Sequence, residues 1–510
     1  MNRNQTIAIL FFALLTFFLA ILGMSATGKP FNYSVDDAYI HLTIARNLAE
    51  NGVWGFRPEA FCSASSSLLW TVLLAGFYKI GLRTAFLPLI LNAAAVIGCL
   101  FLAERVFQKN CPKLAPFWQI AMFGLVLALP HLVLLGMEHC LQCLLYLAFW
   151  ALFSGWVSVR NNQFWLLLLA FLVATIRYEG LFLIAAAVFF CFFEKKWKTG
   201  ASLAVISALP ILAFGWFSIK NGGYFLPNSL MAKANLSELS GSKAIFQNVL
   251  KAWHEMPMVF WTTLAVSGGI LAFLRNESGF TQKLRTGAWL IFISTFFHAS
   301  FAKYGQFFRW ESGQVSLFLM ESSLLFYYFW NSQEHINRAR LSIFSILLTV
   351  PFLIRAQYAF RGTCQAMVDV RAYYFSLAEF VNKHYPPNAL VAVNGIGVVG
   401  YETSGPILDV NGLASTEVLK RGLLLPSAGR IGAFFKEKDV KFAVVGPDYV
   451  PNEMPENWCL AGRWTFPKGI VADSNELFYA MDSAGCAYLR FCLREFAQSH
   501  PQTEFAQPPK

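Results

Sequence analysis

The chain has 510 residues, of which 56% are hydrophobic and only 14% are charged, and its mean hydropathy is +0.49. These values exclude an ordinary soluble protein, in which roughly a quarter of the residues are charged. The formal net charge of +11 does not indicate nucleic-acid binding, because membrane proteins concentrate positive charge in the loops on one side of the bilayer. The composition therefore predicts an α-helical polytopic membrane protein.

Apolar segments along the first 360 residues predict about eleven membrane helices. A helix needs roughly 20 apolar residues to cross the bilayer core, and shorter helices are tolerated where they border a water-filled cavity. The first apolar run follows Arg3 as in a signal peptide, but no cleavage site is followed by soluble sequence, so we expect it to be retained. The expected helices lie at residues 6–24, 84–106, 115–134, 139–158, 163–178, 180–193, 200–219, 256–274, 286–302, 313–330 and 341–357.

The positions of Lys and Arg predict the orientation. With the N-terminus in the cytoplasm, every inner loop carries positive charge, as is typical of cytoplasmic loops. The apolar segment 67–82 is left out of the count because Tyr78 and Lys79 interrupt it, and we expect an interfacial or re-entrant helix there. The odd number of crossings then places the chain from Arg361 onward outside the cytoplasm. The basic residues of the inner loops are Lys109, Lys113, Arg160, Lys195, Lys196, Lys198, Arg275, Lys283, Arg285, Arg338 and Arg340.

The composition changes near Val370. Apolar residues have helical spacing from Arg371 to His384, and the runs ALVAVN and KFAVVG are typical of short strands separated by turns. The pattern predicts a small extracytoplasmic α/β domain over 361–497, after a membrane domain over 1–360. The tail 498–510 has three prolines and no apolar period, so we expect it to be disordered.

Three cysteines of this C-terminal region, Cys459, Cys486 and Cys492, fall in polar sequence. An oxidising compartment permits one pair of them to form a disulfide. Their spacing leaves the choice of pair open.

Two adjacent acids, Asp36 and Asp37, follow the first span by about a dozen residues and open the amphipathic segment DDAYIHLTIARNLAENG. One acid at this position is explained by capping of a helix N-terminus. Two acids are more than a cap requires, and a general base needs an ionisable carboxylate within reach of the attacking hydroxyl. Either residue meets that need.

Several segments in order along about four fifths of the chain resemble bacterial GT-C glycosyltransferases, particularly the cell-wall arabinofuranosyltransferase-like group. The stretch from Asp36 to Trp70, with DDAYI, ARNLAENG, FRPEA and SSSLLW, resembles the first extracytoplasmic loop of that group. Four further segments resemble a "TRPEG" motif, an "LPNTxYAK" loop, a "GxFxRYE" stretch and the start of the exported domain. They are ATIRYEG, YFLPNSLMAK, YGQFFRWE and GIGVVGYETSGPILDVNGL.

The resemblance implies an inverting transfer of a sugar from a polyprenyl-phosphate donor to an acceptor hydroxyl outside the membrane. In this scheme the acid of the first loop deprotonates the acceptor as it attacks the anomeric carbon, and the lipid phosphate leaves. We expect Asp36 to be the base and Asp37 to orient the acceptor or bind sugar hydroxyls. Neither the donor sugar nor the acceptor follows from the resemblance.

A leaving phosphate gains charge in the transition state, so basic groups should face it from a poorly solvated site. The candidates are the basic residues at outer helix ends, Arg309, Lys233 and Arg177, with Lys220 and His41 behind them. The alternative for each is a structural ion pair or a contact with lipid head groups. Arg309 is the favoured residue, since Phe307, Phe308 and Trp310 would give it an apolar rim. The expected substrate-binding residues are His41, Glu311, Glu179, Trp310 and Tyr39.

A metal site is not predicted. His131, Glu138 and His139 lack a defined fourth ligand, and we expect them to form interfacial hydrogen bonds. No cofactor is expected to be required, although a divalent cation remains possible because some GT-C enzymes use one.

The expected partners are the lipid-linked donor, membrane lipids and an extracytoplasmic glycan, lipid or protein acceptor, without nucleic acid. Three other functions remain open: a transporter or flippase of a lipid-linked sugar, a protein O-glycosyltransferase and a non-catalytic assembly subunit.

Overall fold

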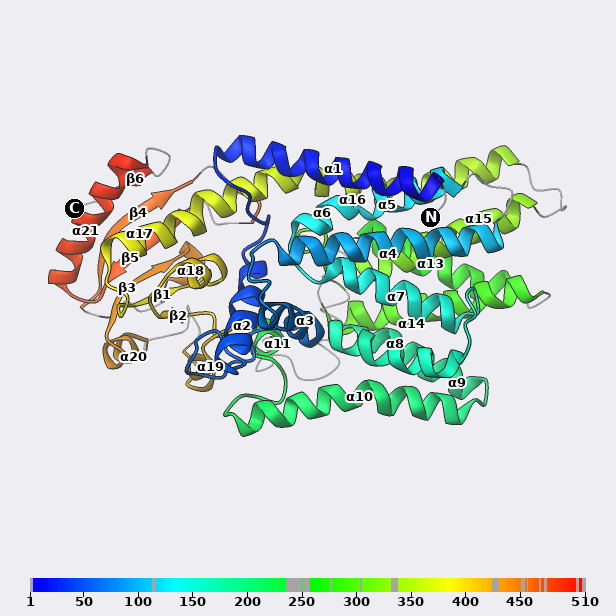
Figure 1. Cartoon of the computed structure of the whole chain (residues 1–510), viewed down its shortest axis with the longest axis horizontal. Helices are drawn as coiled ribbons and strands as arrows, with labels where there is room; N and C mark the ends of the chain where they lie inside the picture. Colours follow the sequence, from blue (N-terminus) through cyan, green and yellow to red (C-terminus); the bar gives the residue numbers. More distant parts are fainter. Residues whose placement is uncertain are drawn as a thin grey trace.

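The computed structural model describes residues 3–111, 116–234, 250, 257–275, 278–302, 305–331, 338–423, 431–450, 455, 457–466, 469–471, 475–500 and 504–506. The molecule consists of a bundle of long helices with a sheet-containing domain at one end (Figure 1). Between these two parts lie the helices α2 (Asp37–Asn51) and α3 (Leu68–Lys79). This arrangement confirms the predicted class, a polytopic helical protein with a small C-terminal α/β domain.

The bundle is built from apolar helices that match most of the predicted segments. Four helical segments of the described chain are long and apolar enough to cross a membrane: Gln5–Thr27, Leu87–Asn110, Trp197–Lys220 and Ala339–His384. The bundle helices are α1 (Arg3–Thr27), α4 (Leu87–Asn110), α5 (Pro116–Leu127), α6 (Leu129–Leu134), α7 (His139–Phe153), α8 (Asn162–Ile176), α9 (Gly180–Phe193), α10 (Trp197–Lys220), α13 (Pro257–Phe273), α14 (Gly279–Phe301), α15 (Ser312–Asn331) and α16 (Arg338–Val370).

Two bundle segments differ from the sequence-based expectation. The segment 115–134 forms two helices, α5 and α6, because Ala128 has a left-handed backbone with φ of 60° and Pro130 offers no N–H to continue the ladder. The helix expected at 341–357 is longer. α16 runs without a break through residue 360 to Val370, and a π-helical turn, η1 (Arg371–Phe375), leads directly into α17 (Ser376–His384). Bundle and α/β domain are thus joined by continuous helix.

The outer surface of the bundle is apolar. Large side chains on the outer helices remain exposed, among them Leu14, Phe17, Trp216 and Leu347, which are 59–67% exposed. Such surface is stable in contact with lipid. The N-terminus of α1, the basic end of α4 and the basic turn between α9 and α10 lie at the end of the bundle remote from the α/β domain (Figure 1). One end of the bundle therefore carries positive charge, and α2 and α3 lie at the other end.

The α/β domain contains a mixed six-stranded sheet with the order β2-β1-β3-β5-β4-β6. β1 pairs in parallel with β2 and β3, whereas β3–β5, β5–β4 and β4–β6 are antiparallel. The predicted strand runs ALVAVN and KFAVVG form β1 and β3. The strands are β1 (Leu390–Val393), β2 (Ile407–Asp409), β3 (Val440–Val445), β4 (Cys459–Thr465), β5 (Asn475–Ala480) and β6 (Glu504–Ala506).

Helices cover both faces of this sheet because side chains alternate along its strands. Phe442 and Val444 of β3 pack into the cluster that includes residues of α17 and α21 (Ser483–Ser499), and Ala443 and Val445 pack into the cluster that includes residues of α19 (Thr416–Lys420) and α20 (Ile431–Glu437). The two remaining short helices are α18 (Gly397–Glu402) and η2 (Pro447–Tyr449). Both faces of the central strands are therefore buried.

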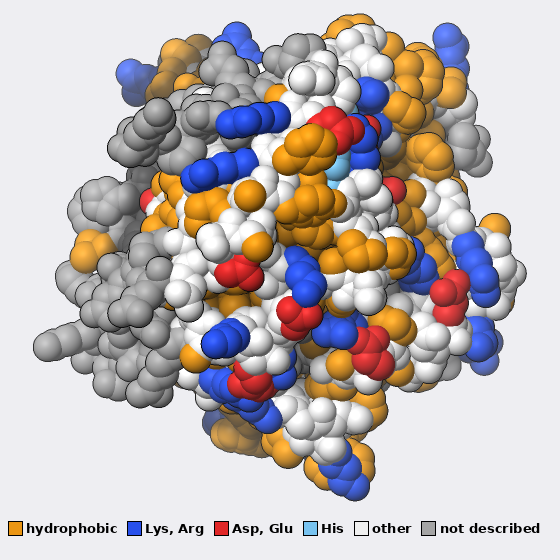
Figure 2. Space-filling model, turned by 90° about the vertical axis from the view of Figure 1, so that its left-hand side faces the viewer, with side chains coloured by type: hydrophobic (Ala, Val, Ile, Leu, Met, Phe, Trp, Pro, Cys, Tyr) orange, Lys and Arg blue, Asp and Glu red, His pale blue; other side chains and the backbone are white. Residues whose placement is uncertain are grey.

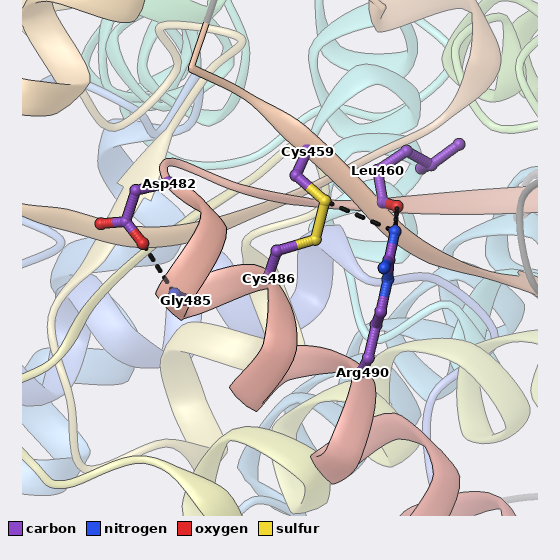
Figure 3. The surroundings of a disulfide bond; sticks show 6 residues. All are labelled: Cys459, Leu460, Asp482, Gly485, Cys486 and Arg490. Carbon is purple, nitrogen blue, oxygen red and sulfur yellow. Dashed lines mark hydrogen bonds between the residues drawn. A yellow bond between two sulfur atoms is a disulfide. The ribbon is translucent and has the colours of Figure 1, made fainter. Parts of the chain in front are cut away.

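One cysteine pair, Cys459 and Cys486, forms a disulfide between β4 and the first turn of α21, while Cys492 remains a buried thiol (Figure 3). Arg490 lies beside the bond, and its Nη2 donates a hydrogen bond to the carbonyl of Leu460 at 3.2 Å. The disulfide attaches α21 to the strand that it covers.

The tail predicted to be disordered includes ordered residues. α21 continues to Ser499, and β6 pairs with β4 through residues 504–506. This pairing is a correction to the sequence-based expectation, and its physical reason is that the edge of β4 offers backbone hydrogen bonds that apolar periodicity does not reveal. The other residues of 501–510 lie outside the described ranges.

The surface of the α/β domain is polar. Acidic and basic side chains are interspersed with small apolar areas on the face at this end of the molecule (Figure 2). Exposed ion pairs occur there, including Lys383–Glu495 at 3.0 Å and Arg421–Glu437 at 2.7 Å. Such a surface is typical of a domain in water, so the membrane-embedded part of the chain is the bundle.

Candidate active site

The two acids of the first loop have different surroundings. The carboxylate of Asp36 accepts hydrogen bonds from two backbone N–H groups at the start of α18, from Gly397 to Oδ2 at 2.7 Å and from Val398 to Oδ1 at 2.6 Å. Burial raises the pKa of Asp36 to about 7, although both N–H groups favour the ionised form. Because both oxygens are engaged, Asp36 attaches α2 to the α/β domain.

The close approach at this contact requires glycine. A Cβ atom on Gly397 would lie 2.0 Å from the backbone oxygen of Asp36, so we expect Gly397→Ala to weaken the docking of the α/β domain on α2. Overpacking of this kind costs about 1–3 kcal/mol, which would appear as a lower unfolding temperature in detergent and faster proteolysis between the two parts. Gly76→Ala on α3 is the matched control, since a Cβ there meets no atom within 4 Å. Equal stability of both variants would contradict this role.

Asp37, in contrast, forms an ion pair with Arg309. Arg309 Nη2 donates to Asp37 Oδ2 at 2.6 Å and also to Gln306 Oε1 at 3.0 Å. The side chain of Arg309 is 4% exposed and that of Asp37 is 30% exposed, so the carboxylate reaches solvent whereas the guanidinium is enclosed. We expected Asp36 to be the general base. This geometry instead favours Asp37, which is the more accessible of the two acids.

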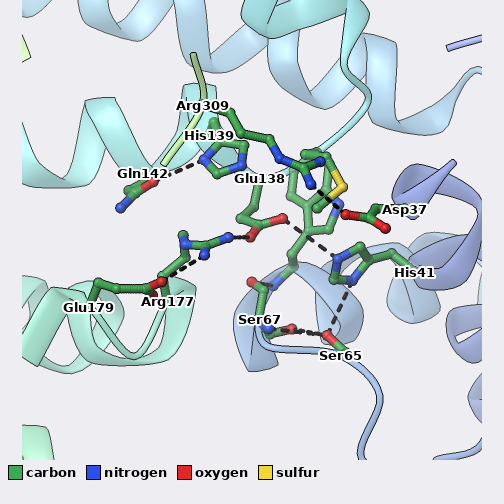
Figure 4. A network of polar contacts seen from close by, with 12 residues as sticks. Asp37, His41, Ser65, Ser67, Glu138, His139, Gln142, Arg177, Glu179 and Arg309 are labelled. Atoms are coloured by element: carbon green, nitrogen blue, oxygen red, sulfur yellow. Dashed lines mark hydrogen bonds and ion pairs between the residues drawn. The ribbon is translucent and has the colours of Figure 1, made fainter. Parts of the chain in front are cut away.

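A second set of charges lies next to this pair. Glu138, between α6 and α7, accepts from Arg177 Nη1 at 2.6 Å, and Arg177 Nη2 donates to Glu179 at 2.8 Å (Figure 4). His41 of α2 lies on the other side of Glu138, with Nε2 at 3.7 Å from Oε2, and its Nδ1 is 3.1 Å from Ser65 Oγ. Burial lowers the pKa of His41, and Glu138 opposes this effect. Glu138 thus connects α2 with α8 and α9.

Several buried polar atoms around these pairs make no hydrogen bond in the structure. They belong to Arg309, whose Nε and Nη1 are both unpartnered, and to neighbouring side chains. Buried donors and acceptors normally find partners, so a cluster of unsatisfied atoms marks a place where a polar ligand or water binds. The neighbouring unpartnered atoms are His139 Nε2, Arg177 Nε and Glu179 Oε2.

The predicted phosphate-binding residues have different places in this arrangement. Arg309 is at the site with two available donors, whereas both terminal nitrogens of Arg177 are bound by carboxylates. Lys220 lies at the end of α10 with Nζ 3.9 Å from the ring centre of Trp216, as expected for a lysine at a membrane interface. Lys233 belongs to α11 (Asn228–Ala234), and its side chain lies outside the described residues.

The predicted substrate-binding residues also divide. His41 and Glu179 belong to the charged network, and Trp310, half-buried, follows Arg309. Tyr39 is only 3% exposed and packs between α2 and the α/β domain, and Glu311 is fully buried.

Glu311 pairs with Arg355 of α16, whose Nε donates to Oε1 at 2.8 Å, and not with the nearby Arg309. Residues two apart at the start of a helix point in different directions, so closeness in sequence did not make them a pair. Phe307 also turns inward, with its ring centre 4.6 Å from that of His131. The expected apolar rim is therefore partly core.

The sequence did not indicate three of the residues that organise this region. Arg355, Gly397 and Val398 lie far along the chain from the groups that they contact, in an apolar helix and in a glycine-containing turn. Glu138 and His131 were expected to form hydrogen bonds, and they do so. In the ranges that the structure describes, no group of three or more His, Cys, Asp or Glu side chains is arranged to hold a metal ion.

Comparisons with known proteins identify the fold. The structure is similar to the crystal structure of ArnT from Cupriavidus metallidurans bound to undecaprenyl phosphate, with a TM-score of 0.53 and 13% identity over 94% of this chain and 98% of that one. It is also similar to an Archaeoglobus fulgidus oligosaccharyltransferase in complex with zinc and sulfate, with a TM-score of 0.51 and 13% identity over 93% of this chain and 73% of that one. The chain therefore has the GT-C fold, as the sequence resemblance implied.

The family comparison concerns only the C-terminal region. Residues 361–482 match a family model described as a domain of unknown function, DUF8728. No curated protein matches the sequence. The arabinofuranosyltransferase-like subgroup thus remains a prediction from sequence motifs.

Proposed function

We propose that this protein is an inverting glycosyltransferase that moves a sugar from a polyprenyl-phosphate donor to a hydroxyl group of an extracytoplasmic glycan or lipid. The Asp37–Arg309 pair at the end of the bundle carries the proposal, because it places an accessible carboxylate next to an enclosed guanidinium with two unpartnered donors. The GT-C fold supports it, as does the similarity to ArnT, which was solved with undecaprenyl phosphate bound.

In the proposed reaction the acceptor oxygen attacks the anomeric carbon from the face opposite the phosphate. The bond between that carbon and the phosphate oxygen breaks, and the bonding electrons leave with the polyprenyl phosphate. The acceptor proton passes to the carboxylate of Asp37. Attack opposite to the leaving group inverts the anomeric configuration.

Arg309 has two roles in this scheme. In the free protein its Nη2 neutralises Asp37, and its Nε and Nη1 donors are available to phosphate oxygens. A guanidinium stays charged and binds phosphate through two parallel hydrogen bonds, and each such pair combines Nη2 with either Nε or Nη1. Because Nη2 belongs to both pairs, a phosphate bound in this way competes with Asp37 for Arg309, so donor binding would release Asp37 from Arg309 and let the carboxylate accept a proton.

The proposed orientation places α2, α3 and the α/β domain outside the cytoplasm of a bacterial plasma membrane. The basic turns at the opposite end of the bundle support this, since positive charge is concentrated in cytoplasmic loops. A lipid-linked donor would then reach the site from the outer leaflet.

The test is transfer by the purified full-length protein in detergent from a panel of synthetic polyprenyl-phosphate sugars. The acceptor arms are a cell-envelope glycan fraction, a lipid fraction and a Ser/Thr peptide, each with and without EDTA. We expect one donor to be consumed and undecaprenyl phosphate to be released. The transferred sugar should have the inverted configuration at its anomeric carbon. Transfer to the peptide alone would replace the proposed acceptor by protein. If no donor is consumed although undecaprenyl phosphate binds, a transporter of lipid-linked sugars becomes the better explanation.

A further inference from the structure

The backbone that carries Arg309 has an unusual conformation. Gly305, Gln306, Phe307 and Phe308 all have positive φ, at 80°, 36°, 59° and 59°. L-amino acids other than glycine disfavour this region, and three of them in succession are rare. A hydrogen bond of 3.3 Å from the Arg309 N–H to the Gly305 carbonyl closes the left-handed turn. Other contacts must hold the turn in this form.

Three buried side chains from different elements bind the backbone of this turn. Glu311 Oε2 accepts from the Gly305 N–H at 3.2 Å, His131 Nε2 is 3.0 Å from the Phe307 carbonyl, and Arg355 Nη2 donates to the Phe308 carbonyl. The three residues are 0–3% exposed, so their contacts are with protein. Every residue from Gly305 to Phe308 except Gln306 is therefore held by a side chain from outside the turn.

These three side chains are themselves fixed. Arg355 and Glu311 form an ion pair of 2.8 Å, and His131 Nδ1 lies 2.8 Å from Thr363 Oγ1 of α16. Because a carbonyl only accepts, His131 Nε2 carries a hydrogen and donates it to the Phe307 carbonyl. All three contacts thus lead back to α16, the helix that continues into the α/β domain.

We infer that His131, Glu311 and Arg355 are positioning residues for Arg309. They hold the left-handed turn so that Arg309 lies against Asp37 with Nε and Nη1 unpartnered, already arranged for an anion. Preorganised donors stabilise developing charge better than mobile ones because nothing has to reorient during the reaction. The inference rests on the proposed function and assigns to Glu311 a role in positioning and not in contact with substrate.

A merely structural role would have a different signature. A buried ion pair contributes little net stability compared with apolar residues of the same volume. The hydrogen bonds of this pair end instead on the turn beside the proposed phosphate site. If the three residues act through Arg309, their substitution should weaken phosphate binding only while Arg309 is present.

The test measures binding of undecaprenyl phosphate to the full-length protein in detergent for Arg355→Lys, Arg309→Gln and the double variant. We expect Arg355→Lys to weaken binding about 10-fold, as for one charged hydrogen bond, and to have no further effect in the Arg309→Gln background. Arg361→Lys, exposed on the same helix, is the control and should bind like wild type.

His131→Leu provides a second variant if Arg355→Lys does not fold, because it releases the Phe307 carbonyl without leaving a buried charge. It should weaken binding in the same direction and again only with Arg309 present. Equal losses with and without Arg309 would overturn the inference while leaving the proposed function intact. Wild-type protein that does not bind undecaprenyl phosphate would overturn both.

Discussion

Replacing Asp37 by Asn is expected to lower the rate of sugar transfer by about 10²–10⁴-fold, the usual contribution of a general base. The amide keeps the size of the side chain but cannot take the acceptor proton. Arg309 retains a hydrogen-bond partner in the amide oxygen, so binding of undecaprenyl phosphate should be kept. Single-turnover transfer from the donor identified in the panel, measured beside lipid binding, separates the two effects.

Asp36→Asn is the matched comparison for this prediction. Its carboxylate is engaged by the Gly397 and Val398 N–H groups, so we expect a smaller loss of rate together with weaker docking of the α/β domain. The reverse order, with Asp36→Asn inactive and Asp37→Asn active, would return the role of base to Asp36. Unchanged rates in both variants would exclude both acids as the general base.

Replacing Arg309 by Gln is expected to reduce kcat/KM for the donor by about 10²–10³-fold, the typical cost of removing one preorganised donor to a developing negative charge. Arg309→Lys should recover only part of this loss, since an ammonium group keeps the charge without the planar pair of donors. Steady-state kinetics with increasing donor, and direct binding of undecaprenyl phosphate, would show the effect.

The control for this experiment is Arg57→Gln, which removes an arginine between α2 and α3 whose side chain is 44% exposed. Because Arg309→Gln also removes the ion pair between Arg309 and Asp37, the double variant with Asp37→Asn tests whether any loss of stability comes from the change at this acid. Donor kinetics of Arg309→Gln equal to wild type would remove Arg309 from the phosphate site.

Much of the bundle was predictable because hydropathy detects apolar segments, and apolar segments are the ones that form helices in lipid. The predicted range 180–193 coincides with α9, and 313–330 differs from α15 by one residue at each end. The break at Ala128 was missed, since a left-handed residue between two apolar helices leaves the hydropathy unchanged. The continuation of α16 beyond residue 357 was missed for a related reason, because only one side of its later turns is buried: Ala359 and Met367 are buried, whereas Arg361 is exposed.

The sequence predicted which residues belong to the candidate site better than it predicted which of them contact one another. Asp37, Arg309, His41, Arg177 and Glu179 were all selected from sequence, and the structure brings them to one end of the bundle. Arg177 forms an ion pair with Glu179, the kind of contact that was considered as the alternative to its expected role in phosphate binding. The partner of Glu311 was not, because it lies 44 residues away on α16.

The sequence by itself determined the class of protein, most of the helical segments, two strands of the α/β domain and the residue types at the site, because each depends on composition or local periodicity. Only the tertiary structure decided which acid binds the α/β domain and which faces Arg309. Asp36 and Asp37 are chemically identical and adjacent, and they differ through contacts with residues 361 and 272 positions away. Adjacent residues near a helix N-terminus point in different directions, and what each meets depends on how the α/β domain packs against the bundle.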